Sequence, residues 1–175
     1  MSEKDNLKDL IKRAIRDDEE ACNRILNLYK GRIFSYVYRM VRNYHDAEDI
    51  TFDVFIKCFK NLPKFDLSRP FIPWLFSIAH NQVIDFFRKH RIEYEYLDER
   101  QSTEDGPESR YEKKIIVEKV EKAIARLSPL DRELVILFHK EEHSYQEISE
   151  ILNLPISTIK TRLHRARKRL RELIK

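Results

Sequence analysis

Residues Ser144–Lys175 have the sequence SYQEISEILNLPISTIKTRLHRARKRLRELIK, in which two helical patterns are separated by a short turn. Ser144 and Glu147 have the spacing of a capping box, in which each side chain bonds a free backbone N–H at a helix start. Asn153 and Pro155 interrupt the pattern, because asparagine often ends a helix and proline lacks a backbone donor. We therefore expect one helix from Ser144 to this turn and a second helix after it.

The second helix has an apolar stripe and a polar, basic face. We expect Ser157 or Thr158 to cap it, and its apolar residues recur at helical spacing: Ile159, Leu163, Ala166 and Leu170. At about 100° per residue, the opposite side carries Ser157, Lys160, Thr161, His164, Arg165 and Lys168. From residue 156 to residue 175, eight Lys and Arg residues stand against one acid. This arrangement predicts a helix-turn-helix whose second helix enters the major groove of DNA. The alternative is a solvated basic helix that ends a bundle.

Composition limits the class of protein. The chain has 175 residues, only two glycines, 37% charged residues and a net charge of +4. We expect an all-α protein with one or two small domains. Cys22 and Cys58 are too few and too far apart in the sequence for a zinc site or a disulfide framework. No apolar run reaches the roughly 18 residues of a membrane span, and the charged start has no signal-peptide core, so we expect a cytoplasmic protein without membrane insertion.

The first half of the chain predicts four helices, at about residues 5–16, 17–42, 46–61 and 71–90, with Gly31 as a weak point in the second. The third is apolar on two sides. Ala47, Val54 and Cys58 share one side, and Phe52, Ile56 and Phe59 lie on nearly the opposite side. The second apolar side is covered either by a partner protein or by neighbouring helices of the same bundle.

Residues 62–70 contain two prolines and no helical period, so they predict a loop, with Phe65 in its middle. Asn81, Asp85 and Arg88 follow one side of the next helix. An exposed aromatic beside this polar side would suit an unstacked base, because every base offers a flat face for stacking. The alternative is that Phe65 belongs to the core.

Residues 93–112 lack a helical pattern and contain eight acids against two arginines. Their composition predicts a flexible acidic linker. We therefore expect two small helical domains, at residues 1–92 and 113–175, the second of four helices ending in the helix-turn-helix.

Three runs of residues carry a family resemblance. Residues 46–50 read DAEDI and are followed by Asp53 and Phe55. A second run consists of Phe65, Phe71, Trp74, Leu75, Ile78, Ala79, Asn81, Asp85 and Arg88. The third extends from Leu127 to Arg167 and includes the pattern Y-x-E-I-x-x-x-L-x-x-P-x-x-T and the residues Arg162, Arg165, Ala166 and Arg167. The chain thus resembles the extracytoplasmic-function (ECF, group IV) RNA polymerase sigma factors of the sigma-70 family, and the match covers nearly all of it.

The resemblance implies a region 2-like domain at residues 1–92 and a region 4-like domain at residues 113–175. It implies that the third helix binds the clamp helices of the largest subunit of bacterial core polymerase, through Asp46, Glu48, Asp49, Phe52, Asp53 and Ile56. Phe65, Asn81 and Arg88 would recognise and melt the minus-ten element. The last helix would recognise the minus-thirty-five element, through Ser157, Thr158, Lys160, Thr161, Arg162, His164, Arg165 and Lys168, with later arginines on phosphates.

The implied partners are core polymerase, including the flap of its second-largest subunit, promoter DNA and an anti-sigma factor; no cofactor or metal is implied. The family usually has glutamine where this chain has Phe52, so a polar polymerase contact is replaced by an apolar one, or Phe52 faces an inhibitor. Two other functions compete. One is a stand-alone helix-turn-helix regulator that binds duplex DNA without polymerase. The other is an enzyme such as a nuclease, for which His139 and His143 form the one histidine pair at helical metal-site spacing.

Overall fold

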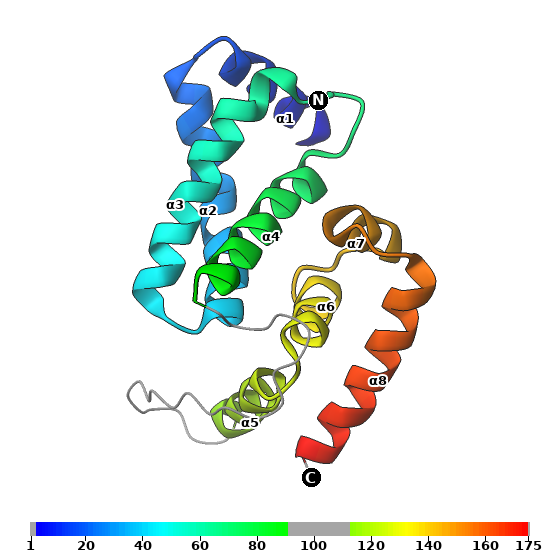
Figure 1. Ribbon diagram of the computed structural model, residues 1–175. Helices are drawn as coiled ribbons and strands as arrows, with labels where there is room; N and C mark the ends of the chain where they lie inside the picture. The colour runs from blue at the N-terminus through cyan, green and yellow to red at the C-terminus, as the bar shows by residue number, and fades with distance from the viewer. Residues whose placement is uncertain (1–2, 91–112, 175) are drawn as a thin grey trace. The chain divides into compact units, whose positions relative to one another are not determined.

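The computed structural model describes residues 3–90 and 113–174, and within these ranges it contains helices and no strand (Figure 1). The elements in chain order are α1 (Glu3–Ile15), α2 (Glu19–Val41), α3 (Tyr44–Asn61), the short 3-10 helix η1 (Leu62–Lys64), α4 (Phe71–Lys89), α5 (Lys113–Ala125), α6 (Pro129–His139), α7 (Tyr145–Leu152) and α8 (Ile156–Ile174). The all-α fold class is therefore confirmed.

The chain forms two compact units, Met1–Val83 and Ile84–Lys175. The division between them falls within α4, upstream of the predicted boundary at residue 92, which stays a prediction. The predicted acidic linker, residues 93–112, lies outside the described residues.

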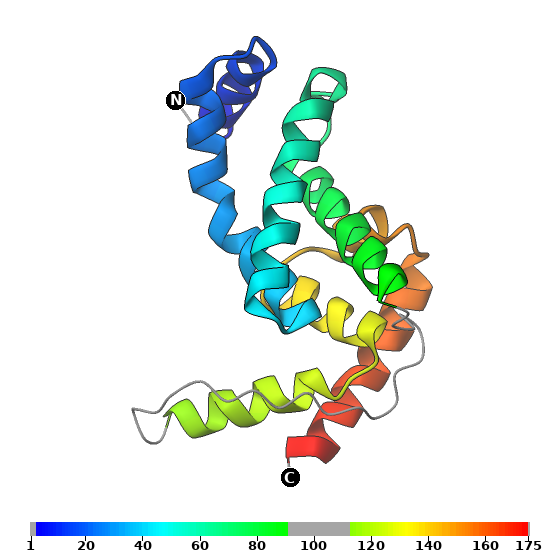
Figure 2. The same cartoon turned by 60° about the vertical axis from the view of Figure 1, so that its left-hand side comes forward.

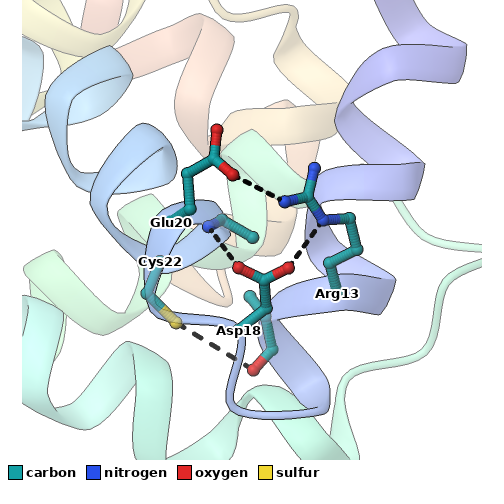
Figure 3. A network of polar contacts seen from close by, with 6 residues as sticks. Arg13, Asp18, Glu20 and Cys22 are labelled. Carbon is teal, nitrogen blue, oxygen red and sulfur yellow. Dashed lines mark hydrogen bonds and ion pairs between the residues drawn. The ribbon is translucent and has the colours of Figure 1, made fainter.

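A polar network joins α1 to α2 in the first unit (Figure 3). Asp17 adopts a left-handed conformation with φ of 61°, and Asp18 caps α2 by accepting a hydrogen bond from the backbone N–H of Ala21 at 3.1 Å. The Arg13 guanidinium donates to Asp18 Oδ2 at 2.7 Å and to Glu20 Oε2 at 3.1 Å. Its hydrogen bond holds the pKa of Asp18 below the ordinary value. This network fixes the direction in which α2 leaves α1.

Helices α2 and α3 lie side by side in both views (Figures 1 and 2). Helix α2 continues through Gly31, which is exposed, so the predicted weak point does not interrupt it. Helix α3 begins at Tyr44, two residues earlier than predicted, because the Asn43 side chain accepts a hydrogen bond from the backbone N–H of Asp46 at 3.1 Å. The buried core of the two helices includes Ile25, Ile33, Tyr36, Val37, Met40, Ala47, Val54 and Cys58.

The two cysteines are free thiols in this core. Cys58 is fully buried, and its burial, with a smaller contribution from Cys22, raises the pKa of its thiol to about 12. Burial also raises the pKa of Cys22, which is half-buried. Both thiols are therefore protonated at neutral pH, a state in which cysteine is a poor nucleophile.

In the second unit, α8 packs against α5, α6 and α7. The core between these helices contains Leu134, Leu137, Ile148, Ile159, Leu163 and Ala166. Ser128 caps α6 by accepting from the backbone N–H of Asp131 at 3.3 Å, and Pro129 occupies its first turn, where its missing backbone donor costs nothing. The basic helix α8 is therefore held in place by its packing against the other three helices of this unit.

The predicted capping box at the start of α7 is confirmed. The Glu147 carboxylate accepts from the Ser144 backbone N–H at 2.8 Å, and the Ser144 hydroxyl accepts from the Glu147 backbone N–H at 3.2 Å. Partial burial raises the pKa of Glu147, but the hydrogen bonds from Ser144 and the neighbouring His143 outweigh burial, so its pKa lies below the ordinary value. The helix ends at Asn153, whose φ of 52° is left-handed.

The predicted cap of α8 is wrong. The helix begins at Ile156, so Ser157 and Thr158 lie inside its first turn. The Pro155 carbonyl accepts the first helical hydrogen bond, from the backbone N–H of Ile159 at 3.1 Å. The Ser157 carbonyl accepts from the Thr161 hydroxyl at 2.9 Å. Because Ser157 is not used as the cap, its exposed side chain stays available at the leading end of the helix.

Candidate nucleic-acid and partner interfaces

Helix α8 presents most of the predicted DNA-binding residues to solvent. Its buried side consists of Ile159, Leu163 and Ala166. The exposed residues are Ser157, Lys160, Thr161, His164, Arg165 and Lys168, while Thr158 and Arg162 are half-buried. In Figure 2 the helix, coloured orange to red, is continuous over this whole length. The sequence therefore places the polar face correctly, and the structure adds that Arg162 and Thr158 lie at its edge.

An open pocket of about 370 Å³ lies at the leading end of α8. It is lined by Asp131 of α6 and by Ser157, Thr158, Thr161, Arg162 and Arg165 of α8. Arg162 Nη1 donates to Asp131 Oδ1 at 3.3 Å across this pocket. Five predicted DNA-binding residues are thus brought together in one hollow.

Two stacked aromatic rings lie in contact with two cations of α8. Phe138 and Tyr145 stack with their ring centroids 5.0 Å apart. The Lys160 ammonium lies 5.5 Å from the centre of the Tyr145 ring, and the Arg167 guanidinium lies 5.1 Å from the centre of the Phe138 ring. Such cation–π contacts contribute about 0.5–1 kcal/mol at exposed sites. Lys160 is therefore restrained on the exposed polar side of the helix.

The two histidines considered for a metal site, His139 and His143, interact with different side chains. His139 Nε2 accepts a hydrogen bond from Arg167 Nε at 3.2 Å. Burial, and secondarily the Arg167 charge, lower the pKa of His139, which keeps it neutral and able to accept. His143 lies beyond the end of α6 and directs Nδ1 toward Glu147 Oε2 at 3.8 Å. Among the described residues, no group of three or more His, Cys, Asp or Glu side chains could hold a metal ion.

Helix α4 keeps two of its predicted residues on the surface. Asn81 and Arg88 are exposed, and Arg88 Nη1 pairs with Asp85 Oδ1 at 3.2 Å. Asn81 and the Asp85–Arg88 pair therefore mark one polar side of α4, as the spacing predicts.

Phe65 does not fit the exposed stacking platform expected from the sequence. It is only 8% exposed. Its ring lies 4.6 Å from the Trp74 ring and 5.7 Å from the Phe71 ring, measured between centroids, and Phe71 in turn lies 5.6 Å from Tyr29. The expectation of exposure is wrong because the loop folds its aromatic residue onto α4. In this conformation Phe65 supports the loop and offers no face to a base.

The second apolar side of α3 is not covered by the described part of the chain. Phe52 is 69% exposed and Ile56 is 49% exposed, one helical turn apart. Acidic side chains surround them: Glu48, Asp49 and Asp53 are exposed, and Asp46 is half-buried. Among the described residues, no neighbouring helix covers Phe52 or Ile56, whereas Phe59 is half-buried.

Sequence reasoning missed three side chains at the α8 surface. Asp131 lies three residues after the Ser128 cap, a spacing that indicates only a favourable acid in the first turn of a helix. Phe138 and Tyr145 have the spacing of core residues, and no local pattern indicates that two cations of another helix lie over their rings. These contacts connect residues 15 to 31 positions apart, beyond the range of helical periodicity.

Comparison with known proteins shows the family to which the chain belongs. The family model of Sigma-70 region 2 matches residues 25–92, and the family model of Sigma-70, region 4 matches residues 118–170. The chain belongs to the sigma-70 family. The ECF RNA polymerase sigma factor SigW of Bacillus subtilis (strain 168) is 35% identical over 182 residues, which cover 97% of each chain. The sigma-70 family member described here is therefore of the ECF group, as the resemblance implied.

Solved structures have the same fold. CnrH, in complex with the cytosolic domain of CnrY, matches with a TM-score of 0.73 at 22% identity, over 95% of this chain and 96% of that one. The sigma factor RpoE of Bartonella quintana, in complex with the anti-sigma factor NepR, matches with a TM-score of 0.70 at 25% identity, over 87% of this chain and 95% of that one.

Family membership decides between the functions considered above. An ECF sigma factor directs RNA polymerase to promoters, so the chain acts in transcription initiation. Sigma factors are initiation factors rather than enzymes. A stand-alone regulator is not favoured, because a region 2 match has no place in it. In the described ranges no helix is both long and apolar enough to cross a membrane.

Proposed function

We propose that three helices of this ECF sigma factor carry out separate tasks in transcription initiation. Helix α3 binds core polymerase, α4 acts at the minus-ten element and α8 recognises the minus-thirty-five element. The observation that supports this proposal best is the presence, in one chain, of an uncovered apolar surface on α3 and a basic polar face on α8. A protein that binds duplex DNA as a monomer needs the second surface only.

The α3 surface suits a protein partner with apolar and basic residues. Phe52 and Ile56 would supply the buried centre of the interface, and the acids around them would form a polar rim. In this proposal the partner is the clamp-helix region of the largest polymerase subunit, with Asp46, Glu48, Asp49 and Asp53 facing its cations. The region 4 unit would contact the flap of the second-largest subunit.

The α8 surface suits the major groove of duplex DNA. Its leading end offers the small polar residues Ser157, Thr158 and Thr161 to base edges, and its cations lie along the following turns. In this proposal, bases or phosphates are contacted by Lys160, Arg162, His164 and Arg165, and a phosphate by Lys168. Arg167 is engaged with His139 and Phe138, so we assign it to the support of α8 rather than to a phosphate.

On α4, we propose that Asn81 and Arg88 act on the unpaired strand of the minus-ten element. In polymerase holoenzyme, Asn81→Ala should reduce promoter opening about tenfold and change initial binding by less than about twofold, because the amide would contact a base only after it leaves the stack. Permanganate reactivity of unpaired thymines reports opening, and gel retardation at low temperature reports binding. Equal loss in both measurements would remove Asn81 from the melting step.

Two further properties follow from the proposal. The chain has no catalytic activity of its own, and it works in the cytoplasm with polymerase. An anti-sigma factor would inhibit it by covering the α3 surface; the similar sigma factor RpoE forms a complex with the anti-sigma factor NepR. Purification of the tagged chain from its own cells should recover a second, non-polymerase protein whose binding is lost when Phe52 is replaced. Recovery of core polymerase alone would contradict this.

Run-off transcription tests the proposed function. Purified bacterial core polymerase is incubated with fragmented DNA of the source organism, with and without the protein. We expect discrete start sites that depend on the protein, with two shared elements upstream of them, and no RNA when core polymerase is omitted. Specific binding to duplex DNA without any new start site would overturn the proposal in favour of a stand-alone regulator.

A further inference from the structure

The pocket at the leading end of α8 contains one acid among its cations and hydroxyl groups. Asp131 comes from α6, whereas the other lining residues come from α8. Its carboxylate accepts from Arg162 Nη1 at 3.3 Å, and the two side chains are 25% and 33% exposed. The pair thus lies at the boundary between the core of the unit and the face assigned to DNA.

Asp131 is itself held in place. Its backbone N–H donates to the Ser128 hydroxyl, which caps α6. The next residue, Arg132, donates from Nη2 to the carbonyl of Ala125 at 2.6 Å and to that of Leu127 at 3.4 Å, which ties the start of α6 to the end of α5. The carboxylate is therefore presented from a rigid helix start rather than from a loop.

A fixed carboxylate changes what Arg162 can do. A free arginine samples many rotamers, whereas a guanidinium held by a carboxylate presents its remaining N–H groups in one direction. The carboxylate also adds a negative charge to the pocket, which disfavours a phosphate there. It does not disfavour the acceptor atoms of a base edge to the same degree, because these carry partial charges only.

We propose that Asp131 is a positioning residue for promoter recognition, which orients Arg162 toward a base edge and so determines the preference at one part of the minus-thirty-five element. This inference deepens the proposed function and rests on it. Neither the family patterns quoted above nor the helical periodicity assigns Asp131 a role in DNA recognition.

The test uses complete holoenzyme and promoter fragments in which the upstream element is randomised. Fragments bound by wild-type and variant holoenzyme are sequenced. Asp131→Asn should reduce the preference at one position, or at two adjacent positions, by about tenfold and leave the other positions unchanged. Binding to fragments without the element should stay equal or become stronger, because a negative charge near DNA is removed. Glu118→Gln, which makes the same charge change on the exposed part of α5, should leave the profile unchanged.

A double-mutant cycle distinguishes positioning from stability. If Asp131 acts through Arg162, then Asp131→Asn should have no further effect on the profile in an Arg162→Ala background, and Asp131→Glu should restore part of the preference. Uniform loss over all positions, an unchanged profile, or additive effects of the two substitutions would each overturn the inference while wild-type selection still succeeds. If wild-type holoenzyme selects no motif, the proposed function itself fails, and this inference with it.

Discussion

Phe52→Asp should reduce binding to core polymerase by at least about thirtyfold, the effect of losing one central residue of a protein interface. Phe52 is 69% exposed in the free protein, next to Ile56 and between Asp49 and Asp53. An aspartate there would remove the apolar contact and place a third carboxylate where the partner must exclude water. Binding to labelled core polymerase, measured by fluorescence anisotropy, reports the loss.

Two controls make this result specific. Phe52→Gln should retain most of the binding, because glutamine is the residue that the family resemblance implies at this position. Thermal unfolding of Phe52→Asp should be close to that of wild type, since exposed helix positions tolerate such changes within about 0.7 kcal/mol. Wild-type affinity of Phe52→Asp for core polymerase would show that the α3 surface is not the docking surface.

The sequence predicts the features of this protein that are local or periodic. The capping box of Ser144 and Glu147, the stripe of Ile159 and Leu163 and the two-sided α3 each depend on residues of a single helix and its cap. Such spacings determine which side of a helix is buried before any tertiary contact is known. Both candidate surfaces, on α3 and on α8, follow from this kind of pattern.

The sequence does not predict whether a loop side chain is buried or exposed, nor which side chains of distant helices are in contact. Phe65 lies in a proline-containing loop, and nothing local indicates that the loop folds the ring onto Trp74. The helix α8 starts earlier than expected, because Pro155 takes the position before the helix and its carbonyl accepts the first helical hydrogen bond, so Ser157 and Thr158 fall inside the first turn. Asp131 and Arg162 are 31 residues apart and lie on different helices, so their pairing is visible only once the helices of the unit are packed together.

Lys160→Ala combined with Arg165→Ala should reduce transcription that depends on the minus-thirty-five element by about a hundredfold. Each good contact of an arginine or lysine with a base contributes about 1–3 kcal/mol, and the two residues lie more than a helical turn apart on the exposed face, so their effects should nearly add. Lys160 is also held over the Tyr145 ring, which reduces the conformational freedom it loses on binding. Run-off transcription from promoters identified with the wild-type protein measures the effect.

Promoters with a scrambled upstream element provide the comparison. On these, the double variant and wild type should differ only in non-specific affinity. Lys168→Ala should instead weaken binding to all sequences alike and lower the slope of log affinity against log salt by about one, as expected for a lost phosphate contact. Lys12→Ala, an exposed cation of α1, serves as a charge-matched control that should change neither quantity. If the double variant lost activity equally on intact and scrambled promoters, α8 would bind DNA only through its charge, and the assignment of base recognition to Lys160 and Arg165 would be wrong.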